Sequence, residues 1–158
     1  MASFVANIAK GRVVEYYNRV ENNDPSPSAL IVVVITQGAA TDDQMKDADT
    51  LTALLAVSGV VERKTNNWAR KKLTDAELAA LPAPDDGSNR YDVSLPAMTW
   101  SAVASGGWAS THLVVCYDAD TGAGTDANIT PLTFNDFVIT PDGSDVTANS
   151  GVFFRATD

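Results

Sequence analysis

The segment that most constrains the fold of this chain is Ala29–Thr36, an apolar run whose residues 31–35 are all β-branched. β-branched side chains lose rotamer freedom in a helix and pack well on a pleated sheet, so this run predicts a β-strand. Its residues do not alternate between apolar and polar, which indicates that both faces of the strand are covered. We therefore expect this strand in the interior of the molecule.

A helix is predicted near the N-terminus, over about residues 5–20. Val13, Tyr17 and Val20 recur at a spacing that places them on one helical face. The segment Asn22–Ser28 contains two prolines, which bar the helix from continuing.

Two capping boxes predict further short helices. Thr41–Gln44 has the pattern in which two side chains satisfy free backbone amides reciprocally. The helix that it opens is expected to run to Ala56, with a break near Asp49. Thr74–Glu77 repeats the pattern and predicts a helix over Asp75–Leu81, which ends at a proline.

Strand signals dominate the C-terminal half, and a further short strand is expected at Trp68–Leu73. The expected C-terminal strands are Tyr91–Trp100 (interrupted at Pro96), Thr111–Tyr117, Leu132–Thr140, Asp145–Ala148 and Val152–Arg155. Helices early and strands late favour an α+β fold. It comprises a mostly antiparallel β-sheet or small β-sandwich in the C-terminal half and a few short helices in the N-terminal half. We expect one domain, residues 1–158, with a β-rich core built from 29–36 and 91–156.

Composition excludes several functions. The 158-residue chain has a formal net charge of −9, which disfavours direct binding to nucleic acid phosphates. No apolar run approaches the 18 residues that a membrane span needs, and no secretion signal is evident, so we expect maturation in a cytosol. Cys116 is the single cysteine, which rules out an intrachain disulfide, and it is expected to be a buried apolar residue.

Catalytic and metal chemistry find little support. His112 is the single histidine, and neither Ser105 nor Ser110 lies in a nucleophile-elbow motif, so we expect no catalytic residue and no cofactor. The loop Asp118–Asp126 leaves a calcium site open, because carboxylates on a tight loop suit that ion. Its spacing departs from the EF-hand pattern, with Ile129 where a bidentate glutamate belongs, which favours an exposed loop of turn formers.

One basic cluster stands out in this acidic chain, formed by Arg63, Lys64 and Arg70–Lys72 around Trp68. Nucleic acid binding by stacking and phosphate contacts is one hypothesis. An exposed strand face, or a patch that complements an acidic neighbouring subunit, fits the net charge better. On that basis we expect that reversing the charges of Arg70 and Lys72 would weaken docking and leave stability unchanged.

Aromatic residues suggest further contacts. Trp100 lies on the apolar face of a predicted strand and is expected in the core, whereas Trp68 and Trp108 are candidates for exposed contacts. A carbohydrate-binding module would use such rings for stacking. The apolar run Val152–Phe154 and the N-terminal helix are candidate surfaces for self-association.

Most of the chain also resembles a family of small virion structural proteins of tailed bacteriophages, whose role in the particle is unassigned. The segments that carry this resemblance are Gly11–Val20, Asn23–Pro25, Ser28–Ile31, Ala69–Lys71, Leu73–Asp86, Arg90–Val93, Leu113–Asp118, Thr125–Asn128, Pro131–Thr133, Thr140–Asp145 and Phe153–Ala156. They contain no motif of known chemistry.

The resemblance implies a non-enzymatic component of the virion, assembled in the host bacterial cytoplasm. A capsid decoration (cement) protein is the first expectation, and a tail, neck or adaptor protein is the alternative. A carbohydrate-binding module or a virion-associated hydrolase is a more distant one. The expected partners are further copies of the chain, with a trimer favoured, and the major capsid protein or other virion proteins. The candidate assembly contacts are Arg63, Lys64, Trp68, Arg70, Lys71, Lys72, Trp108, Phe153 and Phe154.

Overall fold

The computed structural model describes residues 2–106 and 109–157, and a six-stranded antiparallel sheet forms its centre. The strand order is β1-β8-β7-β2-β3, and β4 also pairs with β2, on the edge away from β7. The strands are β1 (Phe4–Val5), β2 (Ala29–Thr36), β3 (Val61–Glu62), β4 (Lys71–Leu73), β7 (His112–Asp118) and β8 (Thr130–Asp136). The predicted α+β fold with antiparallel sheets is confirmed.

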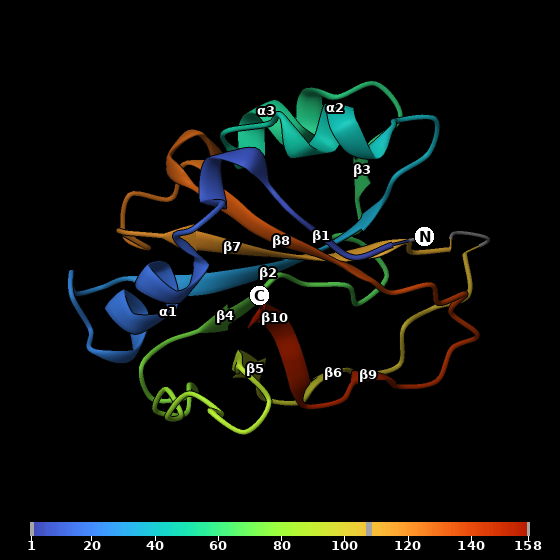
Figure 1. The fold of residues 1–158 in the computed structure, drawn as a ribbon. Coiled ribbons are helices and arrows are strands. Elements are labelled where there is room, and N and C mark those ends of the chain that lie inside the picture. The colour runs from blue at the N-terminus through green and yellow to red at the C-terminus, as the bar shows by residue number, and fades with distance from the viewer. Residues whose placement is uncertain (1, 107–108, 158) are drawn as a thin grey trace.

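Two smaller sheets and the helices form the outer layers (Figure 1). The small sheets lie below the main sheet in this view, with α2 and α3 above it. The small sheets pair β5 (Arg90–Leu95) with β10 (Gly151–Thr157) and β6 (Met98–Trp100) with β9 (Val146–Ala148). The helices are α1 (Val13–Glu21), α2 (Asp42–Lys46) and α3 (Leu51–Ala56), with the 3₁₀ turns η1 (Asn7–Ala9) and η2 (Asp126–Asn128).

The central strand β2 is buried along Ala29–Ile35, as its sequence predicts. It pairs with β7 over its whole length up to Ile35, which faces His112. Val32 lies toward the small sheets, and Val33 points to the opposite face because successive strand residues alternate. Both faces of β2 are buried, which explains why its residues are apolar without alternation.

The predicted helix over residues 5–20 is wrong in its first half. Phe4–Val5 forms β1, where Phe4 pairs with Phe134 of β8 and stacks on its ring at 4.6 Å between centroids. Gly11 adopts φ +78°, a left-handed conformation that interrupts the segment, and α1 begins at Val13. Burial of Phe4 against the sheet outweighs the local helix preference.

The first capping box forms as predicted. The Gln44 backbone amide donates to Thr41 Oγ1 at 3.2 Å, and the Thr41 backbone amide donates to Gln44 Oε1 of the side chain at 2.9 Å. The expected break near Asp49 is also confirmed, because α2 ends at Lys46 and Thr50 caps a separate α3.

The helix predicted over Asp75–Leu81 is wrong. The Thr74 backbone amide donates to Glu77 Oε2 at 2.7 Å, which is one half of the capping box, but only a turn follows. The Ala79 carbonyl accepts a hydrogen bond from the Tyr17 hydroxyl at 2.7 Å. This tertiary contact holds the segment against α1.

Two strands are shorter than predicted. The strand expected over Leu132–Thr140 ends at Asp136, because Phe137 leaves the sheet and packs against Trp68 and Trp100. The strand expected from Trp68 begins at Lys71, since Trp68 turns inward to the same aromatic cluster.

Candidate functional site

The basic cluster lies along β3, the loop that follows it, and β4. Arg70, Lys71 and Lys72 are consecutive, and the strand register places alternate side chains on opposite faces of the sheet. Lys71 pairs with Val32 and Lys72 with Ile31, so these two lysines point away from each other. Adjacency in sequence therefore does not gather the cations on one surface.

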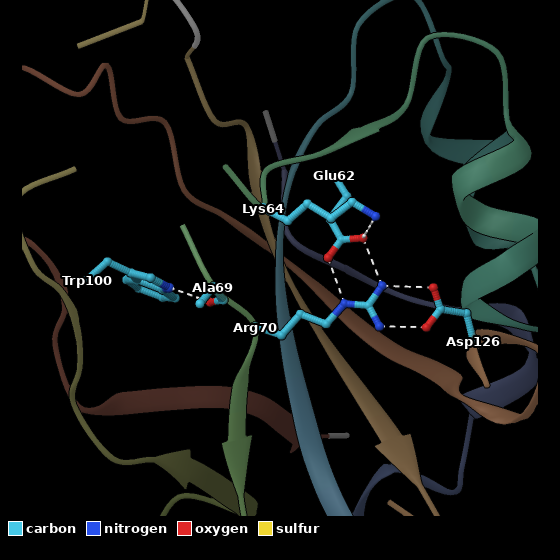
Figure 2. A network of polar contacts seen from close by, with 6 residues as sticks. All are labelled: Glu62, Lys64, Ala69, Arg70, Trp100 and Asp126. Atoms are coloured by element: carbon cyan, nitrogen blue, oxygen red, sulfur yellow. Dashed lines mark hydrogen bonds and ion pairs between the residues drawn. The ribbon is translucent and has the colours of Figure 1, made fainter. Parts of the chain in front are cut away.

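Arg70 is held between two carboxylates (Figure 2). Its Nε lies 2.7 Å from Glu62 Oε1 and its Nη2 lies 2.8 Å from Glu62 Oε2. On the other side, Nη1 lies 2.6 Å from Asp126 Oδ1 and Nη2 lies 2.8 Å from Asp126 Oδ2. The planar Arg70 guanidinium makes a bidentate contact with each carboxylate. It thereby links β3 and η2 to the residue that precedes β4.

The surroundings make this pairing structural. The Glu62 side chain is 4% exposed, Arg70 is 28% exposed and Asp126 is 33% exposed. Hydrogen bonds to Asp126 and Glu62 raise the pKa of the Arg70 guanidinium above its ordinary value. The hydrogen bond from Arg70 lowers the pKa of the Asp126 carboxyl. Arg70 and Asp126 are therefore charged at neutral pH. Because the Glu62 side chain is almost buried, removal of its partner Arg70 is expected to be costly.

The two lysines of β4 also contact other parts of the chain. Lys71 Nζ donates to the Thr99 carbonyl of β6 at 2.6 Å and lies 5.1 Å from the centroid of the Trp100 ring. Lys72 Nζ donates to Thr121 Oγ1 at 2.8 Å, in the loop that also carries Asp126. Both contacts fasten distant segments to β4.

The hypothesis that this cluster forms a continuous exposed patch is therefore wrong for Arg70 and Lys71. Lys64 remains exposed, at 69% of its side chain, with its Nζ 4.0 Å from Glu62 Oε2. Arg63 is partly buried, and its Nε donates to Thr36 Oγ1 at 2.8 Å. Glu62 and Asp126, the partners of Arg70, were missed by the sequence analysis because they lie 8 and 56 positions away from it.

The tryptophans in the described residues are core residues. Trp68 and Trp100 are 5% and 1% exposed, and their rings meet edge to face at 5.3 Å between centroids. Trp100 Nε1 donates to the Ala69 carbonyl at 2.7 Å, on the side of that segment opposite Arg70 (Figure 2). The expectation of Trp100 in the core is confirmed, and the expectation of Trp68 as an exposed contact is wrong. Trp108 lies outside the described residues.

His112 is fully buried on the helix-covered face of the main sheet, where the rings of Phe4 and Phe134 meet it edge-on. Its Nδ1 lies 3.0 Å from Thr111 Oγ1. Burial lowers the pKa of the imidazole, although the Asp42 and Asp136 carboxylates act in the opposite direction. A buried, neutral imidazole packed against two phenylalanine rings is a core group. Cys116, on the same strand, is also buried, as expected.

The acidic loop Asp118–Asp126 uses its carboxylates internally. The Asp120 amide donates to Asp118 Oδ1 at 3.0 Å, and the Gly122 amide donates to Asp120 Oδ1 at 2.9 Å. Asp126 is bound to Arg70. Within residues 2–106 and 109–157, no group of three or more His, Cys, Asp or Glu side chains converges to hold a metal ion. The loop matches the expected arrangement of turn formers.

The remaining candidates, Phe153 and Phe154, lie on β10. Both are partly buried and pack against the core, and the Phe153 ring stacks on Tyr17 at 6.2 Å between centroids. Their neighbour Val152 is one of the few large apolar residues that are exposed, together with Ile8, Val61 and Val138. We call the two-stranded sheet of β5 and β10 the β5–β10 ribbon. Among the apolar candidates for assembly contacts, its strand β10 is open to a partner.

Comparison with known proteins adds no identity, since no protein-family model, curated protein or solved structure matches this chain. In the described part of the chain, no helix has the length and apolar character to cross a bilayer.

Proposed function

We propose that this chain is a non-enzymatic structural component of a tailed-phage virion, most specifically a capsid decoration (cement) protein. The resemblance along most of its sequence supports the class of protein. One structural observation carries the proposal. The charged and polar side chains that could bind a ligand instead contact other segments of the same chain.

The best example is Arg70, the residue most suited to binding an external anion. Four hydrogen bonds hold its guanidinium to Glu62 and Asp126 and join three separated segments. Lys71 is fastened to β6 in the same way. A protein that adheres to a shell needs a rigid body, and these contacts supply rigidity across the layers of the sheet.

His112 supports the same proposal. A histidine used in hydrolysis needs access to substrate and a partner that orients it. His112 is fully buried, and it contacts the rings of Phe4 and Phe134 and the Thr111 hydroxyl, while the Asp42 and Asp136 carboxylates act on it electrostatically. This position favours a packing role over a role in a virion-associated hydrolase.

The carbohydrate-binding alternative loses the support of Trp68 and Trp100, whereas Trp108 lies outside the described residues. Such a module presents aromatic faces to solvent for stacking on sugar rings. Trp68 and Trp100 are instead packed against each other and against Phe137.

Cryo-electron microscopy of the parent particle tests the proposal. We expect density that fits the six-stranded sheet and its outer layers on the outside of the capsid. Particles that lack the chain should release DNA at a lower temperature than particles to which the purified chain has been restored. Density at the neck or tail would favour the alternative virion role, and absence of the chain from purified particles would overturn the proposal.

A further inference from the structure

We infer that the free edge of β10 is a self-association site, at which two copies of this chain join their β10 strands antiparallel about a two-fold axis. The inference deepens the proposed structural role, on which it rests, by naming the contact between copies. β10 differs in length from the other edge strands of the fold.

Exposed strand edges present unpaired amides and carbonyls, and proteins limit the hazard by keeping such strands short. The edge strands of the main sheet follow this rule, because β1 and β3 have two residues each and β4 has three. The sheet of β6 and β9 also has three residues per strand. The seven-residue β10 departs from the rule.

One edge of β10 is used by β5, from the Gly151–Leu95 pair to the Thr157–Arg90 pair. Among the described residues, no backbone hydrogen bond joins the other edge to the rest of the chain. A shallow groove of about 340 Å³ runs beside β10. It is lined by Ser3, Asn135 and Val152–Arg155 and by no residue of β5, so it lies on the free side of β10.

The neighbouring strand β5 is the weaker candidate. It is six residues long, and it carries the charged residues Arg90 and Asp92 within its ladder. Charged side chains on an edge strand oppose the approach of another strand. β10 carries one charge, Arg155, and an exposed apolar residue, Val152.

Local charge favours a second copy despite the net charge of −9. Arg155 is paired with Asp92 through two hydrogen bonds, and Arg90 lies 3.4 Å from both Asp85 and Asp92. The two strands carry Arg90, Arg155 and Asp92, and Asp85 just outside β5 pairs with Arg90, so the positive groups of the ribbon are each paired and two ribbons approach without strong repulsion.

The sequence of β10 permits two-fold pairing. In a register centred on Phe154, Arg155 of one copy faces Phe153 of the other, and Val152 faces Ala156. The two arginines do not face each other, and the Val152–Ala156 and Phe154–Phe154 pairs are apolar. A β-bulge at Phe153 displaces its ring toward Tyr17 and leaves Phe154–Thr157 in regular register with β5.

The test compares Val152→Lys with Val138→Lys. Both valines are exposed, at 45% and 57%, and Val138 lies outside every strand. By light scattering over rising concentration we expect the wild type to approach twice the 16.7 kDa chain mass. Val152→Lys should weaken the dimer at least about tenfold, because lysine on an edge strand opposes pairing. Val138→Lys should leave the dissociation constant unchanged, and circular dichroism should show that both variants remain folded.

Amide hydrogen exchange gives a second measurement on the unmodified protein. We expect amides of Gly151–Thr157 to exchange more slowly as concentration rises, with no such change in β7. A wild-type protein that stays monomeric up to about 1 mM would overturn the inference. So would a trimer, or equal weakening by both lysine variants. A monomer that still enters particles would sink this inference alone, and a dimer absent from particles would sink the proposed function alone.

Discussion

Strands β2 and β10 have similar lengths and apolar residues, yet the fold uses them in opposite ways. β2 pairs along both edges and is covered on both faces, with α2 and α3 on one side of the main sheet and the small sheets on the other. β10 pairs along one edge, and most of its residues are exposed or partly exposed. The main sheet therefore supplies stability, and the ribbon is the region available to a partner.

Two arginines show the same contrast in charged groups. Arg70 and Arg155 each make a bidentate contact with a carboxylate. Arg70 lies against Glu62, which is nearly buried, whereas Arg155 and Asp92 lie at the surface of the ribbon. Since solvent screens exposed ion pairs, equal geometry gives unequal contributions to stability.

The largest expected effect is on the free energy of unfolding, and it compares a core residue of the main sheet with a residue of β10. Phe134→Ala in β8 removes a fully buried ring that stacks on Phe4, and it should lower the free energy of unfolding by about 3–5 kcal/mol. Phe154→Ala in β10 removes a partly buried ring and should cost clearly less. Urea denaturation of both variants measures the difference. Equal costs would contradict the division between a stabilising sheet and an open ribbon.

The next effect tests the two arginines. Arg70→Met should lower the free energy of unfolding by about 2–3 kcal/mol, less than a fully buried pair would, because Arg70 and Asp126 are partly exposed. Arg155→Met is the matched control and should change stability less. If Arg155→Met were as costly as Arg70→Met, burial of the Glu62 pair would not be the deciding factor. A marked loss at Arg70 would also correct the expectation that charge changes there leave the fold unaffected.

A smaller effect concerns pH. His112 is buried and its pKa is lowered, so the unfolded chain takes up a proton near pH 6.5 before the folded chain does. The unfolded state binds more protons in this window, and stability should fall as the pH drops below about 6.5. Urea denaturation from about pH 8 to pH 5 should show the advantage of the wild type over His112→Gln shrinking. A constant advantage would contradict the prediction.

That pH range should not affect the ribbon. Its titrating carboxyl, Asp92, has a pKa below its ordinary value because of the hydrogen bond from Arg155. Asp92 therefore keeps its charge, and the self-association of β10 should be the same at pH 8 and pH 5 when measured by light scattering. A dimer that dissociates over this range would show that a titrating group outside the ribbon controls the contact.

The smallest effect is expected at Lys64. Lys64→Glu changes an exposed cation and should alter the free energy of unfolding by no more than about 1 kcal/mol. Incorporation into particles should weaken if the exposed part of the basic cluster steers docking, and rising salt should weaken wild-type incorporation in the same direction. Unchanged incorporation of Lys64→Glu at low salt would remove Lys64 from the docking surface.

Local patterns predicted much of the fold. The β-branched run of β2, the Thr41–Gln44 capping box and the break before Leu51 follow from side-chain shape and backbone hydrogen bonding within a few residues. The alternation of strands and turns after Tyr91 likewise gave the antiparallel class. These features form in nearly the same way wherever the segment lies in the molecule.

The candidate site was predicted less well, because its roles depend on distant partners. Sequence placed Arg63, Lys64 and Arg70–Lys72 in one cluster, and β-strand alternation then separated Lys71 from Lys72. The sequence contains no local signal that Asp126 would reach Arg70.

The sequence by itself determined the secondary structure class, the buried central strand and the acidic, single-cysteine character of this protein. Tertiary structure alone decided that Val5 joins a sheet instead of a helix, that Trp68 is a core residue, and that Arg70 binds Asp126. The physical reason is that burial and ion pairing depend on which segments meet in space. Those contacts join residues that lie tens of positions apart, beyond the reach of local propensity.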